Sequence, residues 1–175
     1  MELQGKNVLV VGMARTGIAS ARFLLGRGAR VTISDAQGAE EHAAACRELA
    51  GNGVVLETGG HQLKTFLAAA LIVMSPGVPL EIAPLQAAQE RGIEIISEIE
   101  LAYRFLKTPL IAITGTNGKT TTTALLGEMF RDAGKRVFVG GNIGTPLIDY
   151  VAGPQEDDFV IAEISSFQLE AITSF

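Results

Sequence analysis

The chain has 175 residues, carries a net charge of −5 and is 47% hydrophobic. Its sequence pI of about 5.1 argues against a nucleic-acid-binding surface, and its apolar content excludes an intrinsically disordered chain. Cys46 is the single cysteine, so an intrachain disulfide is excluded, and no cysteine–histidine cluster indicates structural zinc. The longest apolar run, residues 67–74, is too short to span a bilayer, and the amino terminus lacks a signal-peptide pattern. We therefore expect a cytoplasmic protein that binds neither nucleic acid nor membranes.

In the first part of the chain, short apolar runs alternate with stretches rich in alanine and leucine. The expected strands are residues 7–11, 30–34, 54–58 and 71–74, and the expected helices are residues 17–27, 38–50 and 80–91. Apolar runs with little alternation are typical of strands that helices cover on both faces. Repeated strand–helix–strand units indicate a parallel, doubly wound sheet, so we predict a Rossmann-like domain over residues 1–97.

A second series of elements begins near residue 93. The expected strands are residues 93–96, leading out of the first domain, then 110–113, 136–140 and 159–164, and the expected helices are residues 98–106 and 119 to about 132. This series predicts a partial second α/β domain over residues 98–175. Because three strands make a small core for such a domain, we expect the sequence to be an N-terminal fragment of a longer protein.

A glycine turn, GMARTG at residues 12–17, follows the first expected strand. It resembles the dinucleotide-binding pattern G-x-G-x-x-G with Ala14 at the middle glycine, and Asp35 follows at about the spacing used for a ribose hydroxyl. The turn suits NAD or another diphosphate-linked nucleotide, or it only permits tight strand–helix packing, and Asp35 could equally cap a helix. The loop at residues 75–79 ends the fourth strand, so these segments should meet at one rim of the sheet unless that loop is only a Pro-Gly turn.

The most informative stretch is LIAITGTNGKTTTT at residues 110–123. An apolar run turns through two glycines into a lysine and hydroxyls, and then becomes helical. Gly115 and Gly118 allow backbone N–H groups to point into one concavity, and the helix directs its positive end there. Lys119 can reach the outer phosphates of a nucleotide, and the hydroxyl of Thr120 can ligate Mg²⁺.

The loop departs from the usual pattern G-x-x-x-x-G-K-[ST] at one position, because its first glycine would stand at Ile113. An ordinary strand-to-helix turn with an exposed lysine is the alternative. We predict that the loop binds ATP or a close relative, and that residues 98–175 are the first part of a P-loop ATP-binding α/β domain. The candidate nucleotide-binding residues are Gly115, Thr116, Asn117, Gly118, Lys119, Thr120 and Thr121.

An acid, Glu163, ends the last expected strand. Its carboxylate should fall at the same rim as Lys119 and Thr120, where it could ligate Mg²⁺ or position a water molecule. Alternatively, it caps the turn that follows. Ser165 and Gln168 could donate hydrogen bonds to a substrate, or they could cap a short helix.

Three segments together resemble the Mur ligases: TGTNGKTT at residues 114–121, GNIG at residues 141–144 and EISSFQLE at residues 163–170. The first is shared with folylpolyglutamate synthases, whereas the last resembles the branch that adds D-glutamate. The resemblance implies a monomer that forms an amide at the expense of ATP with Mg²⁺, in peptidoglycan precursor synthesis. The carboxylate of UDP-N-acetylmuramoyl-L-alanine would attack the γ-phosphate, and the amine of D-glutamate would attack the resulting acyl phosphate.

The resemblance also implies residue roles in both domains. Lys119 would steady the γ-phosphate, Thr120 and Glu163 would hold Mg²⁺, and Asn142 would contact the phosphate and the substrate carboxylate. The residues implied for the rest of the substrate are Thr16 and Gly17 at the diphosphate, Asp35, Ser75 and Gly77 nearby, and Ser165 and Gln168 at the muramoyl end. The family also has a metal-binding histidine, a carbamylated lysine and a C-terminal domain that this sequence does not contain. We therefore expect these 175 residues to retain part of the substrate site without completing ligation alone.

Two other functions are compatible with parts of the sequence. An NAD(P)-dependent oxidoreductase would use residues 12–17 and Asp35, but it would leave Lys119, Thr120 and Glu163 without a role. A non-catalytic nucleotide-binding module would bind ATP and would have no affinity for a UDP-sugar. A folylpolyglutamate-type ligase would need neither the first glycine turn nor the EISSFQLE segment.

Overall fold

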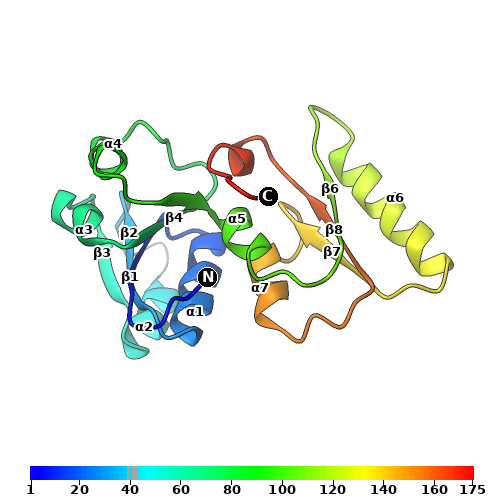
Figure 1. The fold of residues 1–175 in the computed structure, drawn as a ribbon, viewed down its shortest axis with the longest axis horizontal. Coiled ribbons are helices and arrows are strands. Elements are labelled where there is room, and N and C mark those ends of the chain that lie inside the picture. Colours follow the sequence, from blue (N-terminus) through cyan, green and yellow to red (C-terminus); the bar gives the residue numbers. More distant parts are fainter. Residues whose placement is uncertain (39, 41–42) are drawn as a thin grey trace. The chain divides into compact units, whose positions relative to one another are not determined.

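Five apolar runs form a parallel sheet in the first part of the computed structural model, which describes residues 1–38, 40 and 43–175 (Figure 1). The strand order is β3-β2-β1-β4-β5, and the strands are β1 (Asn7–Val11), β2 (Arg30–Asp35), β3 (Val55–Thr58), β4 (Leu71–Met74) and β5 (Ile95–Ser97). All of β4 and all of β1 after Asn7 are buried, which explains why these runs lack alternation. The strand expected to lead out of this domain is instead its fifth strand, because β5 pairs in parallel with β4.

Among the described residues, four α-helices connect these strands. They are α1 (Arg15–Gly26), α2 (Ala43–Gly51), α3 (Leu63–Ala68) and α4 (Ala83–Glu90). Phe66 of α3 and Leu85 of α4 pack with Leu9 and Ile72 of the sheet in one apolar cluster. The sequence did not predict α3, because the helix has six residues and its alanines merge with the apolar run of β4. Of the helix predicted over residues 38–50, residues 39, 41 and 42 lie outside the described part of the chain.

The second part of the chain contains a smaller parallel sheet of order β6-β8-β7. Its strands are β6 (Leu110–Ile113), β7 (Val137–Gly141) and β8 (Phe159–Glu163), and its helices are α5 (Glu98–Tyr103), α6 (Lys119–Asp132), α7 (Leu147–Ala152) and the 3-10 helix η2 (Phe167–Leu169). Glu163 is in register with Ile113 on one side and Gly141 on the other, so three strands end around it. The predicted class, α/β with parallel sheets, is therefore confirmed, although the six-residue α7 was not predicted.

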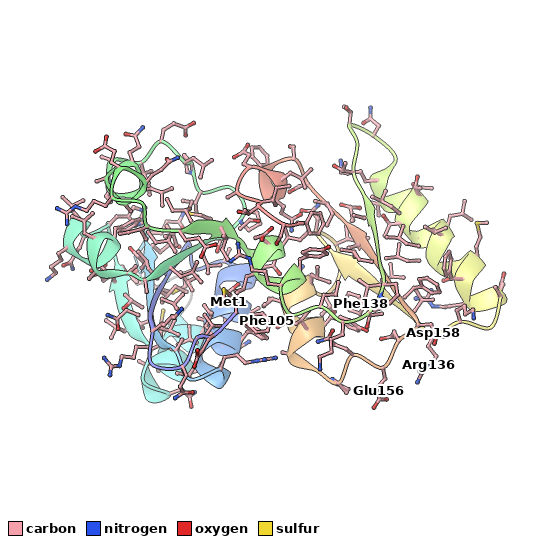
Figure 2. All side chains as sticks on the ribbon, in the orientation of Figure 1. Met1, Phe105, Arg136, Phe138, Glu156 and Asp158 are labelled. Carbon is pink, nitrogen blue, oxygen red and sulfur yellow. The ribbon has the colours of Figure 1, made fainter. Side chains whose placement is uncertain are left out.

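The chain divides into two compact units, Met1–Glu98 and Ile99–Phe175. In the second unit, Arg136 precedes β7 and Asp158 precedes β8, and the two residues lie together at the amino ends of the strands (Figure 2). The backbone N–H of Arg136 donates to Asp158 Oδ2 at 3.0 Å, and the guanidinium lies 3.9 Å from Oδ1. This contact aligns the starts of the two strands at the edge opposite Glu163. Among the described residues, no helix combines the length and the apolar character needed to cross a bilayer.

A close approach of α1 to β1 depends on Gly17. A Cβ atom at this position would lie 1.9 Å from the carbonyl oxygen of Gly12 and 2.6 Å from Ser75 Oγ. Both atoms belong to buried turns that cannot move apart without breaking their own hydrogen bonds, since Ser75 Oγ donates to that same carbonyl at 3.0 Å. Gly12 itself has φ +95°, which favours glycine.

We predict that Gly17→Ala lowers the free energy of unfolding by about 2 kcal/mol or more, because the new methyl group forces α1 away from the sheet. Gly26→Ala is the matched control, since Gly26 lies in the same helix with no atom within 4 Å of its would-be Cβ. That control should be neutral or slightly stabilising. Urea denaturation followed by circular dichroism measures both variants, and equal midpoints for the two would contradict the packing argument.

Candidate functional site

The glycine turn of the first unit is held by the strands on either side of β1. From β2, the carbonyl of Ser34 accepts the N–H of Gly12 at 2.8 Å, and Asp35 Oδ2 accepts the N–H of Met13 at 2.5 Å. From the end of β4, the buried Ser75 hydroxyl donates to the carbonyl of Gly12. The sequence predicted that these segments share one rim, and the structure joins them by hydrogen bonds.

These contacts occupy the polar atoms of two predicted substrate residues. Asp35 Oδ1 accepts the N–H of Gln37 at 2.8 Å, so each carboxylate oxygen already receives a backbone donor. The hydroxyl of Ser75 is committed to the turn. Gly77 is exposed in the loop that follows, with φ +86°. In this structure, Asp35 and Ser75 therefore shape the turn, and the turn presents its backbone to solvent.

The start of α1 is open to an anion. The helix has no side-chain cap and no acidic residue in its first turn, and its N-cap residue, Ala14, is exposed. The side chains of Arg15 and Thr16 make no hydrogen bond or ion pair with any described residue. Free backbone N–H groups, a guanidinium and a hydroxyl at the positive end of a helix can together bind a phosphate or diphosphate.

The loop predicted to bind phosphate, residues 114–118, connects β6 to α6 in the second unit. Gly115 (φ +151°) and Gly118 (φ +78°) take conformations that favour glycine, and Gly118 is the N-cap of α6 without a side-chain cap. Lys119 Nζ donates to the carbonyl of Gly115 at 2.7 Å and to that of Thr116 at 3.5 Å. Its ammonium group therefore lies over its own loop, next to the free N–H groups that open α6. Thr116, Asn117 and Thr121 are exposed.

Glu163, at the carboxyl end of β8, is the centre of this site. Its side chain is 2% exposed, and it accepts hydrogen bonds from Thr120 Oγ1 at 2.6 Å and from Asn142 Nδ2 at 2.8 Å. The backbone N–H of Asn142 also donates to the carbonyl of Glu163 at 2.8 Å. The close pairing requires Gly141, because a Cβ there would lie 2.5 Å from that carbonyl. The structure thus brings Thr120, Asn142 and Glu163 together from three elements.

The same cluster can accept a hard cation. Both donors to Glu163 are neutral, and no ion pair to Glu163 occurs among the described residues. A buried carboxylate without a cation is costly, and its oxygens with the Thr120 hydroxyl are the ligand type that Mg²⁺ prefers. The described residues contain no group of three or more His, Cys, Asp and Glu side chains able to hold a metal. The remaining ligands of such an ion would therefore be phosphate oxygens and water, which is usual for Mg²⁺.

Ser165 and Gln168 lie in the turn after β8 and bind each other. Gln168 Oε1 accepts the backbone N–H of Ser165 at 2.9 Å and its hydroxyl at 3.2 Å, while the N–H of Gln168 donates to Ser165 Oγ at 3.3 Å. Gln168 is 2% exposed. Of the two interpretations that the sequence allowed, these contacts match a capped turn, which holds η2 at a fixed distance from Glu163.

Two family models match the chain in consecutive segments. The Mur ligase MurD-like N-terminal domain matches residues 6–97, and the Mur ligase middle domain matches residues 113–174. The chain belongs to the Mur ligase family. The resemblance predicted from three short segments is thus confirmed over most of the chain.

Similar proteins support the same family. The chain is 57% identical over its 175 residues to the UDP-N-acetylmuramoylalanine–D-glutamate ligase of Geobacter metallireducens, and 54% identical to that of Geotalea uraniireducens. It spans 39% of the length of each of these relatives. A pseudomurein peptide ligase type C from Methanothermus fervidus aligns with 93% of the chain and 33% of its own length, at 27% identity and a TM-score of 0.51. A murein peptide ligase from Psychrobacter arcticus aligns with 95% of the chain and 40% of its own length, at 21% identity and a TM-score of 0.57, and it shows the fold alone.

Sequence reasoning missed the buried carboxylate of Glu100 in α5 of this Mur ligase chain. Its side chain is fully buried, and Oε2 accepts the backbone N–H groups of Thr173 and Ser174 at 3.0 Å each and of Phe175 at 2.9 Å. Oε1 accepts the Ser174 hydroxyl at 2.5 Å and the guanidinium of Arg104 at 2.7 Å. Through these hydrogen bonds, Glu100 holds Thr173–Phe175, the segment after η2, against α5. The only signal in the sequence was an acid between the apolar residues Ile99 and Leu101.

These contacts set the ionisation of Glu100. Burial raises the pKa of the carboxyl, but the hydrogen bonds from Ser174, Thr173 and Arg104 outweigh it and lower the pKa from 4.5 to about 2. Because the folded pKa is the lower one, the ionised form contributes stability above about pH 4.5. That contribution is lost as the pH falls toward 2.

We predict that Glu100→Gln lowers the free energy of unfolding at pH 7 by about 3 kcal/mol, the equivalent of the pKa difference. The variant should also lose part of the stability change between pH 5 and pH 2. Glu156→Gln, at an exposed position in the loop after α7, is the control and should behave as the parent (Figure 2). Urea unfolding at several pH values measures these free energies. If Glu100→Gln loses as much stability as the parent between pH 5 and pH 2, Glu100 is not the group that titrates there.

Proposed function

We propose that the chain supplies the UDP-sugar and ATP sites of a ligase that adds D-glutamate to UDP-N-acetylmuramoyl-L-alanine in peptidoglycan precursor synthesis. In this proposal residues 1–97 bind the UDP moiety, and residues 98–175 are part of the ATP-binding domain. The observation that carries it is the cluster of Thr120, Asn142 and Glu163 beside the phosphate loop. The names of the relatives, D-glutamate ligases at 57% and 54% identity, support this reaction.

In the second unit, the loop would bind the triphosphate through the N–H groups of residues 115–121. Lys119 would leave its carbonyl partners and neutralise the γ-phosphate, where the substrate carboxylate attacks. Thr120 and Glu163 would hold Mg²⁺, which when bound offsets the charge of the phosphates. Asn142 would keep the Glu163 carboxylate aimed at the ion, and would itself contact the phosphate and the substrate carboxylate. Phosphoryl transfer is mostly positioning and charge neutralisation, and these residues provide both.

In the first unit, the diphosphate of the UDP-sugar would lie against the free N–H groups at the start of α1. Thr16 would donate its hydroxyl, and Gly17 would keep the helix close to β1. Asp35 and Ser75 would act by holding the turn, with Gly77 beside them, because their polar atoms already bind backbone. In the second unit, Ser165 and Gln168 would shape the lining of the muramoyl end.

An NAD(P)-dependent oxidoreductase is disfavoured by the same contacts. It would use only the first glycine turn and would give no role to the cluster around Glu163. A non-catalytic module would bind ATP without needing a buried carboxylate that only neutral groups contact. The ligase accounts for both units, and we therefore propose a protein that acts as a monomer on ATP, the UDP-sugar and D-glutamate.

We predict that Glu163→Gln and Thr120→Val each lower the affinity for ATP in the presence of Mg²⁺ by about tenfold, because the first removes the negative charge that attracts the ion and the second removes a hydroxyl ligand. Their affinity for ATP in EDTA should match that of the parent chain. Thr122→Val is the matched control, since Thr122 is an exposed threonine of the same helix without a side-chain hydrogen bond to any described residue. Isothermal titration calorimetry measures these affinities, and a Mg²⁺ effect that survives in Glu163→Gln would rule out the proposed ion site.

We predict that the chain binds UDP and gives no saturable response to NADH. Thr16→Val, which removes one hydroxyl donor and keeps the shape, should weaken UDP binding by about fivefold. Calorimetric titrations with UDP and NADH at equal ionic strength separate the two ligands. Saturable NADH binding without a response to UDP would favour the oxidoreductase instead.

A further inference from the structure

A groove of about 740 Å³ lies in the first unit, at the amino ends of its strands. Leu9, Thr32 and Val55 form its floor, and they are in register across β1, β2 and β3. Neighbouring residues of parallel strands point to the same face of a sheet, so these three side chains make one row. Leu9 belongs to the apolar cluster under α3, which identifies the face.

The floor of the groove is only partly covered. Helix α3 packs on β1 and α4, and its last residue, Ala68, lines the groove with a side chain too small to fill it. Leu9 is 1% exposed, whereas Val55 at the other end of the row is 58% exposed. The row therefore runs from the buried core at Leu9 to the edge strand β3, where Val55 is open.

Two cations line this apolar floor, Arg30 from β2 and Lys64 from α3. Neither side chain makes a hydrogen bond or an ion pair within the described part of the chain. The acid on the same face, Glu57, forms no ion pair with either cation among the described residues: one oxygen accepts the hydroxyl of Thr65, which also lines the groove, and the other is buried without a hydrogen-bond partner. The groove thus combines an aliphatic floor, exposed at Val55, with two cations that form no ion pair among the described residues, in a chain whose net charge is −5.

We infer that this groove is a second ligand site, which binds an aliphatic carboxylate. The acid group meets Arg30 and Lys64, with the hydroxyl of Thr32, which has no hydrogen bond to a described residue, as a further donor. The alkyl chain of the ligand lies along the row from Leu9 to Val55. None of the described lining residues is aromatic, which favours an aliphatic over an aromatic body. The row crosses three strands, about 10 Å, which suits a medium-length chain.

This site is distinct from the proposed UDP site. The glycine turn lies beyond the carboxyl ends of the strands, whereas the groove is lined by Asn7, Arg30 and Val55 at their first residues. Binding in the groove requires none of the residues of the turn. The two sites can therefore be tested independently in the same protein.

The test is calorimetric titration of the 175-residue chain with decanoate, decylamine and decan-1-ol. We expect decanoate to bind at one site, and the amine and the alcohol to bind at least tenfold more weakly. Arg30→Ala and Lys64→Ala should each weaken decanoate binding about fivefold, and Ala68→Leu, which fills the groove, should abolish it. Arg91→Ala is the charge-matched control, an exposed cation of the same unit that does not line the groove, and should bind as the parent.

Two further measurements keep the result decisive. Unfolding midpoints identify any variant that loses its fold. If Ala68→Leu does not fold, the decanoate affinity of Lys64→Ala, a substitution at an exposed helix position, tests the site instead. UDP titrations of the same variants should match the parent, and a failure of UDP binding alone bears only on the proposed function. The site is overturned if decanoate does not bind, if decylamine binds equally well, if Arg30→Ala and Lys64→Ala bind as the parent, or if UDP displaces decanoate.

Discussion

The second unit is organised around the buried carboxylate of Glu163. A charge at the end of a central strand is tolerated only when hydrogen bonds replace the water that it loses. Thr120 provides one bond from the first turn of α6, and Asn142 provides another from the loop after β7. These two bonds tie the loop before α6 and the loop after β7 to β8, so both loops are positioned by the same carboxylate.

Glu100 shows what a fully compensated buried carboxylate looks like in the same unit. It receives three backbone N–H groups, a hydroxyl and a guanidinium, and its pKa falls to about 2. Glu163 receives two neutral side-chain donors and no guanidinium or ammonium from the described residues. This difference separates their roles. Glu100 has its oxygens filled by donors and holds Thr173–Phe175 against α5. Glu163 retains the capacity to accept a cation.

Much of this arrangement could be predicted from the sequence, and the rest depends on contacts that a sequence does not display. Strands 7–11, 71–74 and 110–113 have their predicted bounds, because apolar runs flanked by turns are unambiguous. Helices α3 and α7 escaped prediction, because six residues are too few to establish a helical period. Spacing alone could not decide between a ribose hydroxyl and a local cap for Asp35, whose oxygens accept the N–H groups of Met13 and Gln37, since a strand-end acid can serve a ligand or its own turn. Glu100 belongs to no motif, and only the fold brings Thr173–Phe175 to it.

The two departures from the generic glycine motifs have one physical explanation. Ala14 stands at the middle glycine of the first turn, and its φ of −73° and ψ of −179° are open to any residue. Ile113 stands at the first glycine of the phosphate-loop pattern, but it is the last residue of β6 and pairs in register with Glu163. Glycine is required instead at Gly12 and Gly118 by positive φ, and at Gly17 by the carbonyl 1.9 Å from its would-be Cβ. Both loops thus keep glycine where the backbone demands it, so the mismatches are evidence of a particular turn geometry rather than against anion binding.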